Sequence, residues 1–71
     1  MNYLLKLRKS QGLTQMDVEV ATGIDTATLS LYENGVRYPT VKNAKKLGNL
    51  YKVNWFEFFS GKGDEYDEGR I

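Results

Sequence analysis

The polar groups between Asp25 and Gly35 are small, and few of them carry charge. This segment reads DTATLSLYENG, contains no Lys, Arg or Gln, and has only negative charges, on Asp25 and Glu33. The hydroxyl groups of Thr26 and Ser30 can donate or accept hydrogen bonds, but they discriminate between nucleic-acid bases weakly. If the segment contacts nucleic acid, it does so without the long side chains that usually read base edges.

The side chains that most often carry enzymatic chemistry are absent from the sequence. It contains no His and no Cys, which excludes His- and Cys-based metal sites, thiol nucleophiles and imidazole acid–base catalysis. No paired carboxylates stand out in the body of the chain, and no nucleophile–base set is recognisable. We therefore expect a protein that is not an enzyme, with no catalytic residues, no metal and no cofactor.

Charge is divided unevenly along the 71 residues, although the net charge is only +1. Residues 1–61 contain eight Lys or Arg and five Asp or Glu, a balance of +3. Residues 62–71 contain two and four, a balance of −2. A mildly basic body is compatible with nucleic-acid binding but does not establish it. We expect one domain over residues 1–61 and a flexible acidic tail over residues 62–71.

The apolar residues do not form a membrane or export signal. No apolar run approaches the roughly 20 residues that a membrane-spanning helix requires. The apolar start of the chain is interrupted at once by Lys6, Arg8 and Lys9, which does not fit a signal peptide. These observations predict a cytoplasmic protein without a membrane partner.

Start and stop signals divide residues 1–61 into short helices. Thr14, with Asp17 three residues later, forms a capping-box pattern, and Asp25 and Thr40 occupy further N-cap positions. Glycines stand just past helical runs, where a left-handed residue is needed, at Gly12, Gly23 and Gly35. The predicted helices span residues 3–10, 14–22, 25–34, 40–51 and 54–59. No segment alternates as a strand would, so we expect an all-α fold of five short helices.

Apolar residues recur at spacings of three and four and predict a single core. The expected core residues are Leu4, Leu7, Leu13, Val18, Ala21, Ile24, Leu29, Tyr32, Val41, Ala44, Leu47, Leu50, Trp55, Phe58 and Phe59. Leu29 and Tyr32 turn the inner face of the third helix toward this core. The opposite face of that helix then carries positions 26, 27, 30, 31 and 34.

The second and third predicted helices are joined only by TGI, residues 22–24, which is typical of a helix-turn-helix unit, here at 14–34. Residues 12–40 resemble the phage repressor/Cro-type (XRE-type) helix-turn-helix family. The matching motifs are Leu13-Thr14-Gln15, Gly23-Ile24, Leu29, Tyr32, Glu33-Asn34-Gly35 and Pro39-Thr40, and VNWFEFFSG at 53–61 is similar to the closing helix of the family. The resemblance covers about residues 1–61 and implies a five-helix lambda-repressor-like DNA-binding domain.

One position departs from the family pattern. Family members usually carry a small residue, often Ala, where this chain has Glu19. This position tends to lie near the crossing of the two helices. We therefore expect Glu19 to extend outward, to find a partner or to widen the crossing.

The resemblance implies that the third helix lies in the major groove of double-stranded DNA. The matching base-reading positions are Thr26, Ala27, Ser30 and Leu31. The matching phosphate-binding positions are Gln15, Asn34 and Arg37, and Lys42 is an expected further contact. The alternative for Arg37 and Lys42 is ordinary solvated surface charge. The resemblance also implies an internal ion pair between Arg8 and Glu33, with an exposed and energetically negligible pair as the alternative.

The resemblance further implies a transcriptional regulator, most often a repressor, that binds DNA as a homodimer. Family members commonly pair through the last part of the chain. Phe56 lies there, at a position where a polar residue is commoner. We expect Phe56 to contact a second copy of the chain, and the alternative is that it folds back onto its own domain.

The composition of the third helix leaves two functions open. Ala27, Leu31 and the methyl group of Thr26 can contact thymine methyl groups, which favours a DNA reader that prefers AT-rich sites. The same small apolar strip also suits a protein partner. The alternative function is therefore a protein-interaction module on the same fold, such as an antitoxin-like or anti-regulator protein.

Overall fold

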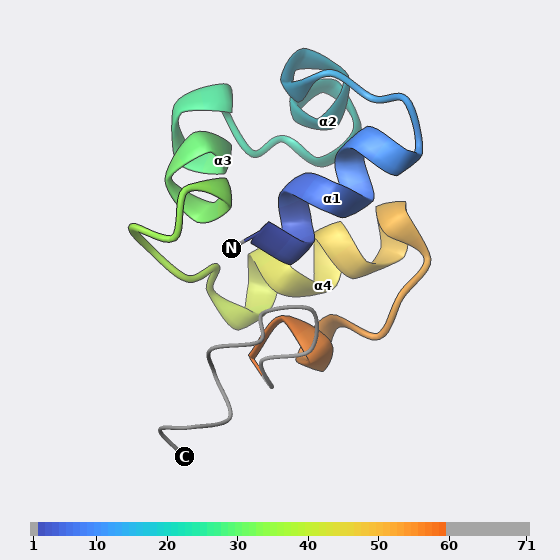
Figure 1. Ribbon diagram of the computed structural model, residues 1–71. Coiled ribbons are helices and arrows are strands. Elements are labelled where there is room, and N and C mark those ends of the chain that lie inside the picture. Colours follow the sequence, from blue (N-terminus) through green and yellow to red (C-terminus); the bar gives the residue numbers. More distant parts are fainter. Residues whose placement is uncertain (1, 60–71) are drawn as a thin grey trace.

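The computed structural model describes residues 2–59, which form four α-helices and one short 3-10 helix (Figure 1). The elements are α1 (Asn2–Ser10), α2 (Gln15–Thr22), α3 (Thr26–Glu33), α4 (Val41–Tyr51) and η1 (Trp55–Phe59). The predicted all-α class is confirmed for these residues. The last predicted helix, residues 54–59, is a 3-10 helix, a form that usually occurs in short pieces. The predicted acidic tail, residues 62–71, lies outside the described residues.

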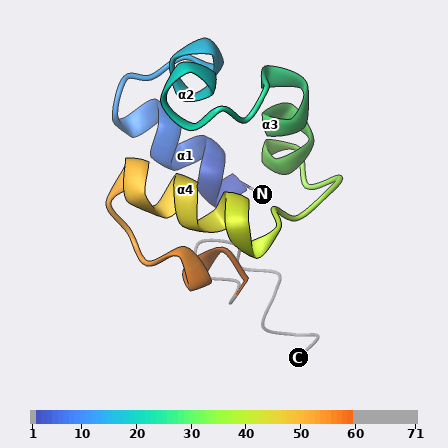
Figure 2. The ribbon, with the colours of Figure 1, turned by 180° about the vertical axis from the view of Figure 1, so that it is seen from behind.

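The helices form two layers around one core. In both views α2 and α3 lie at one end of the domain, and η1 lies below α4 at the other end (Figures 1 and 2). α1 packs against α3, and α2 packs against both α3 and α4. The helix-turn-helix unit is therefore supported from below by α1 and α4.

A contact between the first and last elements closes the lower end of the domain. The hydroxyl group of Tyr3, on α1, donates a hydrogen bond to Glu57 Oε1, on η1, at 2.9 Å. The Tyr3 ring also packs at a tilt against the ring of Phe58, with 5.9 Å between the centroids. Phe58 itself is buried. Residues from opposite ends of the described chain therefore cover the core together.

Local hydrogen bonds at the helix ends agree with the predicted start signals. The N–H of Asp17 donates to Thr14 Oγ1 at 3.0 Å and the N–H of Thr14 donates to Asp17 Oδ2 at 2.8 Å, which completes a capping box. These bonds from Thr14 lower the pKa of Asp17 below its ordinary value. Thr40 Oγ1 accepts from the N–H of Asn43 at 3.1 Å and caps α4. α4 ends at Tyr51, and its C-cap residue Lys52 takes a left-handed conformation (φ 64°) that is usually adopted by Gly.

The core is close to the predicted one, with instructive differences. Its buried hydrophobic residues among residues 2–59 are Leu4, Val18, Ile24, Leu29, Tyr32, Ala44, Leu47, Tyr51 and Phe58. The prediction was wrong for Val41, Phe59 and Ala21, which are exposed. Val41 is the first residue of α4, so no earlier turn of that helix covers its side chain. Phe59 is the last residue of η1, and the period of three residues per turn directs its ring away from that of Phe58. Tyr51, one turn beyond Leu47, was missed.

Tyr51 predicts how the domain responds to alkali. Its hydroxyl group is buried and has no hydrogen-bond partner among residues 2–59. Burial, with a further effect of the negative charge on Glu33, raises the pKa of Tyr51 to about 12. An unfolded Tyr ionises near pH 10, so the unfolded state loses its proton first. The stability contributed by Tyr51 is thus fully present below about pH 10 and is lost as the pH rises through about 12.

We expect Tyr51→Phe to remove this part of the alkaline unfolding and to cost no more than about 1 kcal/mol at pH 7, because no hydrogen bond is lost. Urea unfolding at pH 7 and pH 11, followed by the fluorescence of Trp55, measures both effects. Tyr32→Phe is the matched control, since the Tyr32 hydroxyl group accepts from Asn43 Nδ2 at 2.9 Å. Equal losses at pH 7 for the two variants would contradict the prediction.

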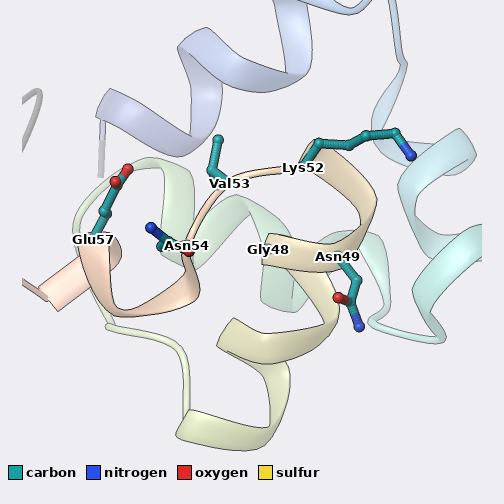
Figure 3. Close-up of a pocket in the computed structure, with 6 residues that line it drawn as sticks. All are labelled: Gly48, Asn49, Lys52, Val53, Asn54 and Glu57. Atoms are coloured by element: carbon teal, nitrogen blue, oxygen red, sulfur yellow. The ribbon is translucent and has the colours of Figure 1, made fainter.

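A shallow hollow of about 520 Å³ lies where α4 meets η1 (Figure 3). It is lined by Gly48, Asn49, Lys52, Val53, Asn54 and Glu57, so α2 and α3 do not contribute to it.

Among the described residues, 2–59, no helix is both long and apolar enough to cross a membrane. These residues also contain no group of three or more side chains of the metal-binding types placed to hold an ion.

Candidate nucleic-acid interface

The turn between α2 and α3 is short and held by local hydrogen bonds. Gly23 ends α2 in the left-handed conformation (φ 81°), and its N–H donates to Glu19 O at 2.8 Å. The hydroxyl group of Thr22 donates to Val18 O at 2.7 Å and accepts from the N–H of Ile24 at 3.1 Å. Ile24 is buried and anchors the turn in the core. α3 therefore has a fixed direction relative to α2.

Glu19 takes part in positioning α3. Its Oε1 accepts a hydrogen bond from the N–H of Thr26, the first residue of α3, at 3.0 Å. Asp25 occupies the N-cap position of α3, but its side chain forms no cap hydrogen bond. Glu19 was expected to extend outward, to find a partner or to widen the helix crossing. The structure shows that it has a partner, the backbone N–H of Thr26. An acceptor supplied from the preceding helix thus binds the first N–H of α3. Asp25 still faces the start of α3, where the Thr28 side chain lowers its pKa.

The outward face of α3 carries the predicted small side chains. Leu29 and Tyr32 are buried beneath the helix. On the other face Ala27 is exposed, whereas Thr26, Ser30 and Leu31 are half-buried. No Lys, Arg or Gln is present on α3. This face is therefore smooth and uncharged, and the backbone of α3 can come close to a flat or grooved surface.

The end of α3 is joined to α1 by a buried ion pair. Arg8 Nε donates to Glu33 Oε2 at 2.7 Å, and Arg8 Nη2 donates to Glu33 Oε1 at 3.0 Å. The two side chains are only 11% and 4% exposed, respectively. Arg8 Nη1 also donates to Leu13 O at 3.0 Å. The hydrogen bond to Glu33 raises the pKa of Arg8. Because Arg8 pairs with it, Glu33 does not present an unpaired negative charge on α3.

Gln15 lies beside this ion pair at the start of α2. Its Nε2 donates to Glu33 Oε1 at 3.2 Å, an interaction that joins α2 to the end of α3. Gln15 also lines a shallow hollow of about 500 Å³ together with Arg8, Lys9, Gly12, Leu13 and Thr14. This hollow combines a helix N-terminus with the exposed Lys9, an environment that favours an anion. The sequence alone did not indicate the contact between Gln15 and Glu33.

The other residues predicted to contact phosphate lie after α3. Asn34 is exposed, and its Nδ2 donates to Ser30 Oγ at 3.2 Å. The chain then turns at Gly35 (φ 77°), and the N–H groups of residues 36 and 37 both point to Leu31 O. Arg37 and Lys42 are exposed. The structure thus places Asn34 next to a predicted base-reading residue and leaves the two cations at the surface on either side of the turn into α4.

Phe56 belongs to an exposed aromatic cluster around η1, formed by Tyr38, Trp55, Phe56 and Phe59. The Phe56 ring stands edge-on to Trp55, at 6.0 Å between centroids, and the Phe56 residue is 55% exposed. Phe59 packs edge-on against both Trp55 and Tyr38. Lys45 Nζ lies 5.4 Å from the centre of the Trp55 ring. The cluster is held rigidly by its own ring contacts and still presents apolar surface.

These features define a helix-turn-helix domain, with a short second helix, a glycine turn and a third helix whose outer face is uncovered. Comparison with known proteins agrees. A helix-turn-helix family model matches residues 4–58. The chain is also 39% identical, over 57 residues, to the uncharacterized HTH-type transcriptional regulator YqaF of Bacillus subtilis (strain 168), an alignment that covers 80% of this chain and 75% of that protein. The chain belongs to the XRE-type helix-turn-helix family. No solved structure matches it.

Proposed function

We propose that the chain is a sequence-specific DNA-binding transcriptional regulator that acts as a repressor. In this proposal α3 enters the major groove, and Thr26, Ala27, Ser30 and Leu31 meet base edges. Gln15, Asn34, Arg37 and Lys42 contact the phosphates on either side. The family membership and the relative named as a transcriptional regulator support the proposal.

The observation that carries the proposal is the outward face of α3, which has no charged side chain and ends beside hydrogen-bond donors and a cation. Glu33 is the negative residue within α3, and Arg8 pairs with it. Gln15 is bound to Glu33 at the end of α3, and Asn34 and the exposed Arg37 follow that end in the chain. Donors beside the end of a neutral helix suit phosphate contacts that hold this helix in a groove. Because small side chains reach base edges only at close approach, we expect specificity to depend on thymine methyl groups and on DNA shape.

Selection of bound duplexes from a random pool tests this function. We expect an AT-rich, roughly two-fold symmetric consensus with few positions defined by guanine. Lys42→Ala should weaken binding to all duplexes and reduce the slope of log K against log salt by about 0.9, the value for one lost phosphate contact. Lys52→Gln, at the opposite end of α4, is the control and should leave the slope unchanged.

The same measurement separates the proposal from a protein-interaction module on this fold. The small apolar strip of Ala27 and Leu31 is the feature that suits such a module. A protein binder would show no salt-dependent binding to any duplex while remaining folded. A guanine-rich consensus would instead mean that the base-reading residues are wrongly assigned.

We also propose that the regulator is a homodimer that pairs through the aromatic cluster around η1. η1, which carries Phe56, lies below α4 at the end of the domain away from α2, so pairing through η1 leaves the reading helix of each copy uncovered (Figures 1 and 2). Binding of a dimer to two half-sites would also compensate for the weak discrimination between bases by a single α3 helix. Phe56→Ser is expected to shift sedimentation toward the monomer at micromolar concentration. Val20→Ser, which changes an equally apolar and 79% exposed residue on α2, is the control and should not change the mass.

A further inference from the structure

One carboxylate oxygen connects the ion pair to the start of α2. Glu33 Oε1 accepts from Arg8 Nη2 at 3.0 Å and from Gln15 Nε2 at 3.2 Å. The Glu33 side chain is only 4% exposed, and its other oxygen is held by Arg8 Nε at 2.7 Å. The acceptor that Gln15 uses is therefore fixed in position by two bonds from Arg8.

This contact determines what the Gln15 side chain can offer to a ligand. A Gln amide group has two N–H donors on one nitrogen, and they point in directions set by the plane of the amide. When one N–H is bound to Glu33, the plane is fixed and the direction of the second N–H is fixed with it. A long side chain that would otherwise sample several rotamers is thereby ordered before any ligand arrives.

Electrostatics adds a second requirement. A phosphate group that accepts from Gln15 approaches the carboxylate of Glu33, and two negative groups at this range repel each other. Arg8 removes this repulsion, because it forms two hydrogen bonds with the carboxylate and is itself nearly buried. Glu33 can then serve as an acceptor for Gln15 without opposing the phosphate.

We infer that Glu33 is a positioning residue for the phosphate contact of Gln15, and that Arg8 neutralises Glu33 so that this contact can form. The inference rests on the proposed DNA-binding function and gives the ion pair a role in binding as well as in stability. Because the contact is made to a phosphate, it contributes equally to all sequences. Because the amide group is neutral, the contact leaves the salt dependence of binding unchanged.

Two double variants separate positioning from stability. Arg8→Met with Glu33→Gln removes both charges but keeps an acceptor oxygen within reach of Gln15. Arg8→Met with Glu33→Leu removes the charges and the acceptor. Each is measured with Gln15 present and with Gln15→Ala, against the duplex selected from the random pool. Circular dichroism establishes that all four proteins are folded at the temperature of the assay.

With Gln15 present, we expect the Glu33→Gln background to bind about tenfold more tightly than the Glu33→Leu background, a typical effect for one hydrogen bond to a charged group. Gln15→Ala should cost about tenfold in the first background and nothing in the second, with the salt slope the same throughout. Equal losses in the two backgrounds, or none in either, would overturn the inference and leave the DNA-binding function standing. Failure of the unaltered protein to bind any duplex would overturn both.

The free protein gives an independent readout. The side-chain amide protons of Gln15 should show a well-dispersed NMR signal in the unaltered protein and in the Glu33→Gln background. In the Glu33→Leu background the signal should return to the position of an exposed Gln. A signal typical of an exposed Gln in the unaltered protein would overturn the positioning role without any reference to DNA.

Discussion

Glu33→Ala is expected to destabilise the domain by about 3–5 kcal/mol, the usual cost of removing one partner of a buried ion pair. The Arg8 guanidinium group would lose two hydrogen bonds, at 2.7 and 3.0 Å, and would remain with a side chain that is only 11% exposed. A small domain has a total stability of only about 5–15 kcal/mol. The variant should therefore unfold at a much lower urea concentration, with Trp55 fluorescence and far-UV circular dichroism changing together.

The double variant Arg8→Met with Glu33→Leu is the control for this prediction. It leaves no uncompensated charge, and apolar residues of similar volume can replace a buried pair at little cost. We expect it to be more stable than Glu33→Ala by at least about 2 kcal/mol. If the single and double variants unfold at the same urea concentration, the loss comes from packing and the ion pair is not the cause.

Gly48→Ala is expected to reduce stability by about 2 kcal/mol, although Ala favours a helix interior over Gly by about 1 kcal/mol. An added Cβ at Gly48 would lie 2.9 Å from Val53 O and 3.0 Å from Trp55 Cβ. Val53 leads into η1 and Trp55 begins it, and the Val53 oxygen is a backbone atom that cannot move alone. The substitution should push η1 away from α4 and partly expose Phe58.

The sign of the effect makes this prediction decisive. Without the clash, Gly48→Ala would stabilise the helix. Asn49→Ala, at the neighbouring exposed position, is the control and should raise stability by roughly 0.5 kcal/mol through helix propensity alone. Thermal unfolding of both variants, with Trp55 emission as the probe of η1, measures the difference. A stabilised Gly48→Ala variant would mean that η1 is not packed as closely as the structure shows.

Features that depend on neighbouring residues were accessible from the sequence. The capping box of Thr14 and Asp17 and the cap at Thr40 follow from side chains that bond to backbone groups three positions away. The outward position of Ala27 on α3 follows in the same way, because Leu29 and Tyr32 define the inner face through the period of the helix. Local geometry therefore determined both the helix boundaries and the orientation of α3.

Features that depend on packing between helices were not accessible. Glu19 was expected to extend outward, to find a partner or to widen the crossing of α2 and α3. Which of these occurs, and that the partner is the N–H of Thr26, was not predictable from its side-chain type. The contact of Gln15 with Glu33 joins residues 18 positions apart in the sequence and requires the docked arrangement of both helices. Several acceptors in the chain could bind the Gln15 amide group. The one that does so can be assigned only when the distances between Gln15 and these acceptors are known.

The contact of Tyr3 with Glu57 has a consequence for the order in which the chain can complete its fold during synthesis. These residues are 54 positions apart, and translation adds about 5–20 residues per second, so about 3–11 s separate their emergence. Until Phe58 emerges, the side of the core that it covers remains open to solvent. The nascent domain therefore carries an apolar surface that a chaperone can recognise until Phe58 packs against the core.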